Sequence, residues 1–366
     1  MPPLDLEPAR PGALTPGRAD PRIDVSVIVP AHNAAPTLPD LFASLVLQGI
    51  ALERLEVIVV DDASTDPTGA TARAAREELP ELIVLRNDTP AGAADARNQA
   101  LALARGARIA FLDADDWLAP GHLAALAQAM DRLDVAFVKC DHVTALGKAR
   151  ELRRAPAPRR GVPLDPRQSL LPTATTTMVD YPNLWTGLYS RALLDAGLLW
   201  LPEGMATAED RVWTWRLHLG APSFAVVDAP GVFYRRGDPN SLTGVFDERR
   251  LGYLEAARRT AALLAQDPDR ERFMPKVVHT ALALTAFHRQ FRWQMPWELR
   301  RRLVREAARL LTEFPPALVR AQIDACPPLR AQRLAPVFRL YRRSEGRSGA
   351  GSGPARGTGR SQRWPG

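Results

Sequence analysis

The fold class follows most directly from one segment, residues 108–117, with the sequence RIAFLDADDW. Its first half has the short apolar composition of a buried parallel strand, and three acids follow directly: Asp113, Asp115 and Asp116. Because open α/β sheets bind ligands at the carboxyl ends of their strands, these acids are candidates for binding a divalent metal or a substrate. They could instead cap the next helix, and the spacing alone leaves both interpretations open.

Short apolar strands alternate with helices along the first part of the chain. Strands are predicted at residues 25–30, 55–60, 82–85, 109–112 and 135–140. This alternation is typical of βαβ units on a parallel sheet. The second strand also ends in acids, Asp61 and Asp62, and a parallel sheet places this end on the same edge as Asp113. We therefore expect an α/β domain with a mostly parallel central sheet flanked by helices.

The acids at this edge argue against the common nucleotide-binding loops. The sequence has no G-x-G-x-x-G after its first strand and no G-x-x-x-x-G-K-[ST] segment. A phosphate group bound here would need a cation in place of a glycine-rich loop.

The chain is expected to have four parts. These are a disordered lead-in at 1–22, the α/β domain at 23–245, a helical C-terminal region at 246–343, and a disordered tail at 344–366. Helices of the third part are predicted at 251–264, 273–291, 296–311 and 329–341. The segment 146–177 inside the α/β domain is loop-like and basic.

Positive charge is concentrated near the C-terminus. Residues 1–248 contain 24 Arg and Lys against 32 Asp and Glu, whereas residues 249–343 contain 20 against 8. A basic region of this kind suggests an anionic membrane surface or an anionic polymer as a partner, and we expect no nucleic acid. The alternative is an ordinary solvated surface of helices in an arginine-rich protein.

The sequence also favours a cytoplasmic location, with attachment at the inner face of the membrane as a further expectation. No apolar stretch reaches the roughly 18 residues that a membrane-spanning helix needs. The N-terminal residues lack the apolar core of a signal peptide. Cys140 and Cys326 form no C-x-x-C pair, which is typical of a reducing compartment.

Five motifs, taken together, resemble the family 2 glycosyltransferases of GT-A fold. They are the segments 25–33, 59–66, 92–98 and 111–117, and the pair Glu209-Asp210. Each motif alone is weak, but their order and spacing are specific, and the resemblance covers roughly residues 24–243. It implies a GT-A domain with a helical appendage that transfers a sugar, with inversion, from a nucleotide-sugar to a hydroxyl. We expect a UDP-sugar donor and a glycan or lipid-linked acceptor of the cell surface or of a secreted polymer.

The resemblance also implies which residues bind the donor. The matching positions are Pro30, Ala31, His32, Asn33, Asp62, Arg97, Asp113, Arg235 and Ser241. Asp62 matches the acid that hydrogen-bonds the base edge, Arg97 a basic residue near base and diphosphate, and Asp113 the ribose-binding acid. His32 replaces the family's aromatic residue, so that stacking is retained but the identity of the base stays open.

Metal and proton transfer are implied in the same way. Asp115 matches the D-x-D ligand of Mn²⁺ or Mg²⁺, a Lewis acid for the leaving diphosphate, and Asp238 stands near the position of the family's histidine ligand. Asp210 matches the general base, with Glu209 as the alternative. Direct attack opposite the leaving group inverts the anomeric centre. Asp116 is then expected to cap the helix that follows.

Two other functions remain open at this point. A nucleotidyltransferase shares paired acids, but it would be expected to have a Gly-rich basic loop where this chain has Ala31-His32-Asn33. A non-catalytic nucleotide-sugar or glycan-binding protein on a degenerate GT-A scaffold would explain His32 and the missing histidine. The intact D-x-D segment and the pair Glu209-Asp210 argue against it.

Overall fold

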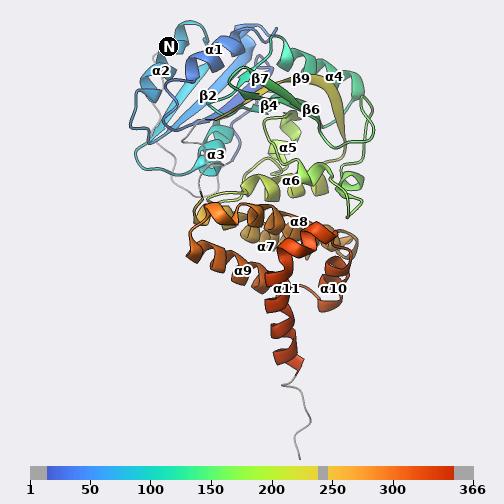
Figure 1. Cartoon of the computed structure of the whole chain (residues 1–366). Coiled ribbons are helices and arrows are strands. Elements are labelled where there is room, and N and C mark those ends of the chain that lie inside the picture. The colour runs from blue at the N-terminus through green and yellow to red at the C-terminus, as the bar shows by residue number, and fades with distance from the viewer. Residues whose placement is uncertain (1–14, 238–245, 350–366) are drawn as a thin grey trace, which may run out of the picture. The chain divides into compact units, whose positions relative to one another are not determined.

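The protein is described here by a computed structural model, which covers residues 15–237 and 246–349 and omits the side chains of 346–349 (Figure 1). The chain forms two compact units, Met1–Thr280 and Ala281–Gly366. Among the described residues, no helix combines the length and the apolar character needed to cross a bilayer.

The first unit is built on one mixed sheet, to which the described residues contribute nine strands in the order β3-β2-β1-β4-β8-β6-β9-β5, with β7 paired to β6. The strands are β1 (Val25–Ala31), β2 (Leu55–Asp62), β3 (Leu82–Asn87), β4 (Arg108–Phe111), β5 (Trp117–Leu118), β6 (Phe137–Leu146), β7 (Ala149–Arg153), β8 (Gly187–Ser190) and β9 (Phe224–Arg236). The first four are parallel to one another. β8 runs antiparallel to both β4 and β6, whereas β9 runs parallel to β6.

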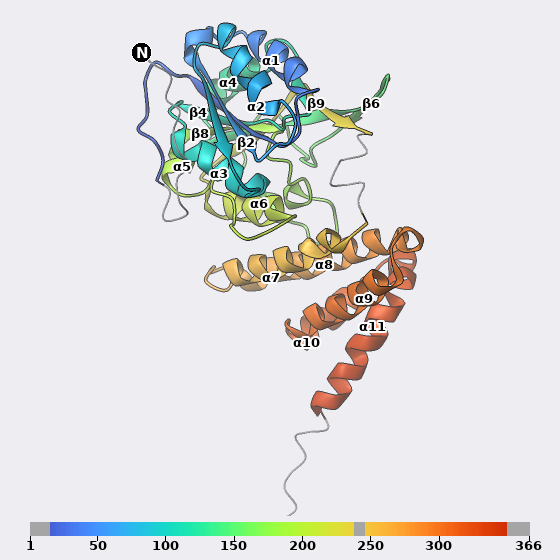
Figure 2. The same ribbon diagram turned by 90° about the vertical axis from the view of Figure 1, so that its left-hand side faces the viewer.

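Helices cover both faces of this sheet. Figure 2 shows α1 (Leu38–Val46), α2 (Thr68–Ala74) and α4 (His122–Leu133) over one face, and α3 (Ala93–Leu103), α5 (Arg191–Asp195) and α6 (Glu209–Gly220) over the other. α7 (Gly252–Leu264) packs against α6, and α8 (Arg270–Gln290) contains the boundary between the units. Because both faces are covered, every residue of β2 is buried, as expected for a parallel strand inside a doubly covered sheet.

The second unit is helical. It contains the end of α8, then α9 (Trp297–Thr312), α10 (Pro316–Asp324) and α11 (Pro328–Gly349). α9 is amphipathic: Leu299, Leu303 and Leu310 are buried, and α9 packs against α11. α11 continues into the segment 344–366, for which we expected disorder, whereas residues 350–366 and 1–14 lie outside the described residues. The four-part division of the chain stays a prediction.

The predicted α/β class is confirmed, but several elements were not predicted, namely β5, β7, β8, α5 and α10. β7 lies within the segment 146–177 that we interpreted as a loop. All five of its residues are exposed, so the strand carries no alternation of apolar and polar side chains to signal it. α10 was also not predicted; it lies between the proline pairs Pro315-Pro316 and Pro327-Pro328.

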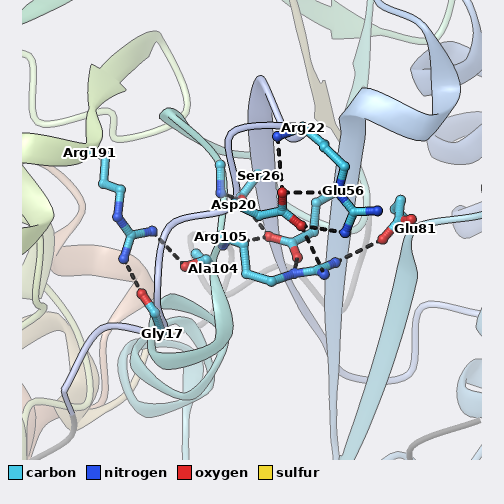
Figure 3. Close-up of polar contacts among 10 residues, drawn as sticks. Gly17, Asp20, Arg22, Ser26, Glu56, Glu81, Ala104, Arg105 and Arg191 are labelled. Carbon is cyan, nitrogen blue, oxygen red and sulfur yellow. Dashed lines mark hydrogen bonds and ion pairs between the residues drawn. The ribbon is translucent and has the colours of Figure 1, made fainter.

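A buried polar network joins the amino ends of the strands, opposite the edge that carries the acids (Figure 3). Glu56 of β2 is fully buried, and its carboxylate accepts hydrogen bonds from the Ser26 hydroxyl, from the Arg105 amide at 2.8 Å and from Arg105 Nε at 2.5 Å. Arg105 also pairs with Glu81 at 2.8 Å. The amide of Gly106 donates to Ser26 Oγ at 2.8 Å. The network therefore connects β1, β2, the start of β3 and the turn into β4.

We expect Glu56→Ala to lower the free energy of unfolding by about 3–5 kcal/mol, because the buried partners of the carboxylate lose their acceptor. Urea denaturation followed by circular dichroism measures this change. Asp131→Ala is the matched control, since it breaks the exposed Arg108–Asp131 pair, for which a loss below about 1 kcal/mol is expected. Equal losses in the two variants would contradict the role given to Glu56.

Candidate active site

The loops that follow β1 and β2 are bound to each other at the carboxyl edge of the sheet. The backbone amide of Asn33, at φ 51°, donates to Ser64 Oγ at 2.9 Å, and Asn33 Oδ1 accepts from the Thr65 amide at 2.8 Å. Pro30 and Ala31 end β1 beside Val60 and Asp61 of β2. The four positions predicted for the first nucleotide loop therefore lie directly beside the second motif, and the side chain of Asn33 is used to join the two loops.

Asp62 anchors the segment before α3. Its Oδ1 accepts from Asn87 Nδ2 and from the Ala91 amide, and its Oδ2 accepts from the Gly92 amide, each at 2.8 Å. Gly92 has φ 93°, a conformation that favours glycine. Sequence reasoning missed Asn87, which ends β3 beside Asp62 and could have been found from that strand end alone. Any base that Asp62 contacts must share an oxygen already bound to the protein.

His32 is exposed and its ring has a defined tautomer. Nδ1 lies 2.7 Å from the carbonyl oxygen of Asp62, and a carbonyl only accepts, so Nδ1 carries the proton. Nε2 is then an acceptor and lies 3.3 Å from the side-chain nitrogen of Asn33. The ring thus lies at the same edge of the sheet as the two loops, and its stacking on a base stays a prediction.

Arg97 joins the D-x-D segment to the acids of α6. This residue of α3 is only 6% exposed. Its Nη2 donates to Asp113 Oδ1 at 2.6 Å, and its Nη1 lies 3.3 Å from Glu209 Oε1. Among the described residues its buried Nε has no hydrogen-bond partner. One guanidinium therefore neutralises two acids that are far apart in the sequence and makes them part of one site.

The three acids of the D-x-D segment have different environments. Asp113 and Asp115 are partly exposed, whereas Asp116 is fully buried. Asp116 Oδ1 accepts from the Arg235 amide at 2.7 Å, and within the described part of the chain its Oδ2 has no partner. Burial, with added repulsion from the charges of Asp113 and Asp115, raises the pKa of Asp116 well above its usual range.

The predicted role of Asp116 as a helix cap is wrong. The chain enters β5 directly after Asp116, and α4 begins only at His122, with Gly121 at its N-cap. The carboxyl group instead holds the end of β9, because its Oδ1 accepts a hydrogen bond from the backbone amide of Arg235.

Arg235 lies at the D-x-D segment, and its predicted binding of the donor stays a prediction. Its Nε donates to the carbonyl oxygen of Asp115 at 2.7 Å, and its Nη2 pairs with Asp40 at 2.8 Å. The guanidinium also stacks over the Trp117 ring, at 4.7 Å from the centroid. Sequence reasoning missed Asp40 and Trp117 as its partners. The other two predicted residues of this region, Asp238 and Ser241, lie outside the described residues.

The acid cluster fits a divalent metal that brings further ligands with it. The described residues contain no group of three or more His, Cys, Asp or Glu placed to hold a metal by themselves. Asp113 and Asp115 nevertheless supply carboxylate oxygens, which Mn²⁺ and Mg²⁺ prefer, and the Oδ2 of Asp116, which has no partner among the described residues, belongs to the same cluster. Diphosphate oxygens and water would have to complete the coordination.

Glu209 and Asp210 form the first turn of α6 but differ in their partners. Glu209 is paired with Arg97, whereas Asp210 forms no ion pair with the described residues. Burial, and next the negative charge of Glu209, raise the pKa of Asp210 to about 6. A carboxylate with this pKa is better suited than an ordinary aspartate to accept a proton near neutral pH.

Asp210 opens onto a pocket of about 770 Å³, which we call the Asp210 pocket. Its walls come from β6, β7, β9, the segment 180–183 and the start of α6. The lining residues are His142, Thr144, Leu152, Arg153, Arg154, Asp180, Tyr181, Pro182, Asn183, Asp210, Arg211, Tyr234 and Arg236. Apart from Asp210, sequence reasoning identified none of these as site residues, because they are spread over five separate elements.

Residues 26–201 match the sequence profile of the family described as Glycosyl transferase family 2. The resemblance to the family 2 glycosyltransferases, inferred from the five motifs, is thereby confirmed over this segment of the chain.

Two relatives illustrate the similarity. The poly(ribitol-phosphate) beta-N-acetylglucosaminyltransferase TarS of Staphylococcus aureus is 28% identical over 228 residues, which are 61% of this chain and 38% of that protein. The succinoglycan biosynthesis protein ExoU of Rhizobium meliloti is 42% identical over 103 residues, which are 28% of this chain and 29% of that protein. The chain thus spans less than half the length of these curated relatives.

A solved structure agrees with the fold. The crystal structure of S. aureus TarS 1–349 in complex with UDP-GlcNAc has a TM-score of 0.69 to this chain at 22% identity, covering 90% of this chain and 92% of that one. The predicted GT-A architecture with C-terminal helices is therefore confirmed.

We expect the carboxyl group of Asp210 to titrate near pH 6, and Glu209→Gln to lower this pKa, since the variant removes the neighbouring negative charge. Carbon-13 NMR of protein labelled at aspartate carboxyls measures the titration, with Asp210→Asn identifying the resonance. Glu53→Gln, at the amino end of β2, is the control and should leave the titration unchanged. A resonance that Glu209→Gln does not move would refute the electrostatic account.

Proposed function

We propose that this protein is an inverting, metal-dependent glycosyltransferase that moves a sugar from a nucleotide-sugar to a hydroxyl of a cell-envelope or secreted glycan, or of a lipid-linked acceptor. The ion pairs of Arg97 carry this proposal, because they join the D-x-D acid Asp113 to the acid pair of α6. Donor chemistry and proton transfer can then occur in one place.

The donor side consists of the two loops and the D-x-D segment. Asp62 and His32 would face the base, and Asp113 would accept from a ribose hydroxyl. Asp115 would hold Mn²⁺ or Mg²⁺, which when bound stabilises the leaving diphosphate as a Lewis acid. Arg235, already tethered to the backbone of Asp115, would add positive charge there. The roles of Asp238 and Ser241 stay predictions.

Asp210 is the better candidate for the general base. It would accept the proton of the acceptor hydroxyl as that oxygen attacks the anomeric carbon from the side opposite the diphosphate, and this direction of attack inverts the centre. Glu209 is less suited to this role, because its charge is already shared with Arg97.

The names of the relatives support the choice of substrates. One structural neighbour was solved with UDP-GlcNAc. A further relative, from Escherichia coli, is named as a UDP-Glc:alpha-D-GlcNAc-diphosphoundecaprenol beta-1,3-glucosyltransferase and is 38% identical over 93 residues, 25% of this chain and 36% of that protein. A UDP-sugar donor and an envelope acceptor are therefore our first candidates.

We expect Asp115→Ala and Asp210→Asn to fail at different steps. Asp115→Ala should abolish Mn²⁺-dependent binding of UDP, because it removes a metal ligand. Asp210→Asn should keep that binding but lose transfer by about 10²–10⁴-fold, because the amide cannot accept a proton. Calorimetry with UDP and a donor screen by mass spectrometry measure the two steps. Full transfer by Asp210→Asn would eliminate it as the base.

We further propose that the second unit attaches the enzyme to the cytoplasmic face of an anionic membrane. On α9, exposed Arg301, Arg302 and Arg305 lie opposite its buried leucines. Trp293 is 72% exposed and Trp297 58% exposed, and both rings carry an arginine guanidinium over one face. Exposed tryptophans with arginines suit the interface of an anionic bilayer. Both cysteines are free, which suits a reducing compartment.

Sedimentation with liposomes tests this attachment. We expect binding to vesicles with anionic lipid at low salt, loss of binding at high salt, and weaker binding by Trp293→Ser/Trp297→Ser. Leu47→Ser, which changes a residue that is 57% exposed in the first unit, is the control. Binding to an anionic polymer but not to vesicles would favour the polymer as partner. If the protein binds neither vesicles nor polymer, the basic face is an ordinary solvated surface and the proposed attachment is wrong.

A further inference from the structure

We propose that the Asp210 pocket binds an acceptor that carries phosphate, with Arg154, Arg211 and Arg236 as the residues that recognise it. This inference rests on the proposed function, because it treats the pocket beside Asp210 as the place where the acceptor hydroxyl is presented. It adds the chemical class of the acceptor, which neither the motifs nor the D-x-D geometry determines.

The charge of the pocket lining is the first observation. Four arginines line it, Arg153, Arg154, Arg211 and Arg236, against only two acids, Asp180 and Asp210. Within the described residues, only Arg153 among the four is paired with an acid, Glu151 at 2.8 Å. Arg154 and Arg211 have no hydrogen bond or ion pair through their guanidinium groups in the same part of the chain, and Arg236 contacts only Tyr234.

The second observation is that, within the described residues, neither acid of the pocket forms an ion pair with these arginines. Asp180 Oδ2 pairs with buried Lys276 at 2.6 Å and accepts from the Thr177 amide, and its Oδ1 accepts from Thr280 at 3.0 Å. Asp210 is the proposed base. The charge of Arg211 acts on Asp210, and Arg154 and Arg236 then carry positive charge that no acid of the pocket lining pairs within the described residues, so a phosphate group would balance it.

Other arginines around the site form ion pairs with acids. Arg97 is paired with Asp113 and Glu209, Arg160 with Asp141 and Asp228, and Arg235 with Asp40. Since these arginines already have acid partners, Arg154, Arg211 and Arg236, which form no ion pair within the described part of the chain, stand out as ligands for an external anion. Arg is also the residue best suited to this task, because its planar group donates two parallel hydrogen bonds to phosphate oxygens.

The donor's own diphosphate is not the expected occupant. The pocket lining includes none of the D-x-D acids, none of the nucleotide-loop residues, and neither Arg97 nor Arg235. The donor phosphates would instead lie at the acid cluster, where a divalent metal neutralises them. The donor diphosphate would thus be bound through a metal at the acid cluster, and the acceptor phosphate through arginines at the Asp210 pocket.

The aromatic residues of the pocket lining, which pack on Trp185 behind them, suit the polyol or sugar portion of such an acceptor. The Tyr234 ring stacks on Trp185 with centroids 5.1 Å apart, and the His142 ring meets Trp185 edge-on at 4.8 Å. The Tyr181 hydroxyl donates to the carbonyl oxygen of Cys140 at 3.1 Å and accepts from His142 Nδ1 at 2.6 Å. Aromatic faces with fixed polar groups pack against the C–H faces of a polyol, while the arginines hold its phosphate.

Calorimetry on the full chain tests the inference with three probes: a glycerol-phosphate hexamer, a farnesyl diphosphate-linked N-acetylglucosamine, and uncharged maltohexaose. The titrations are done at fixed ionic strength and in EDTA, which removes divalent metal, so that the acids of the donor side repel phosphate. We expect at least one phosphate-bearing probe to bind about tenfold or more tightly than maltohexaose, a difference that two charge-assisted hydrogen bonds can supply.

The matched variants have the same change in net charge. The double variant Arg154→Gln/Arg211→Gln should lower the affinity for the phosphate-bearing probe by about tenfold or more. The control Arg132→Gln/Arg159→Gln changes two exposed arginines outside the pocket, and it should change this affinity by less than about twofold. Preference for the hexamer would identify a phosphodiester polymer, and preference for the lipid probe a diphosphate-linked acceptor. Equal binding of charged and uncharged probes, or equal weakening by the two double variants, would overturn the inference.

The donor experiment keeps this test separate from the proposed function. If the wild-type protein binds UDP with Mn²⁺ but binds neither phosphate-bearing probe, the phosphate inference is refuted. The glycosyltransferase proposal is then unaffected. Failure to bind any nucleotide-sugar would refute the proposed function, whatever the phosphate probes do. Asp115→Ala should bind the phosphate-bearing probe like wild type, because Asp115 lies outside the pocket lining.

Discussion

Arg97 lies buried in α3 and contacts Asp113 at 2.6 Å and Glu209 at 3.3 Å. These acids come from the end of β4 and the start of α6, and without a cation between them their like charges would repel across a poorly solvated space. The pairing also leaves Asp210 as the member of the acid pair that forms no ion pair with the described residues. The division of roles between Glu209 and Asp210 therefore follows from where one guanidinium is placed.

The two edges of the sheet use buried acids in opposite ways. At the amino edge, Glu56 is fully satisfied by Ser26 and Arg105, so that its charge serves only to hold the strands in place. At the carboxyl edge, Asp116 has one oxygen bound to the Arg235 amide and one without a partner among the described residues. Glu56 is thus completed by its neighbours, whereas Asp116 is not, although other acids of the carboxyl edge, such as Asp62, are also completed by protein groups.

Charge is also divided between the two sides of the site. The donor side gathers acids that need a divalent cation before a diphosphate can approach. The Asp210 pocket gathers arginines that need an anion. Because Asp210 belongs to this pocket and Glu209 is paired with Arg97, the proposed base lies between the two regions. Donor and acceptor would thus be sorted by electrostatics before any specific hydrogen bond is formed.

Much of the fold could be predicted from the sequence, and the reason is periodicity. Apolar runs that end in acids identify parallel strands and one functional edge, since all such strands end on the same side of the sheet. The spacing of the motifs then identified Asp62, Arg97, Asp113 and Asp210 in one family pattern. β7 escaped prediction because all of its residues are exposed.

The partners of these residues were decided only by the tertiary structure. Asp116 has the same local sequence whether it caps a helix or supports a strand, and its actual partner, Arg235, is 119 positions away. The Asp210 pocket combines β6, β7, β9, the segment 180–183 and α6, none of which carries a recognisable motif for it. Local patterns determine which segments become strands and helices, because those depend on neighbouring residues. Which charges meet depends on how distant segments pack, and no local pattern contains that information.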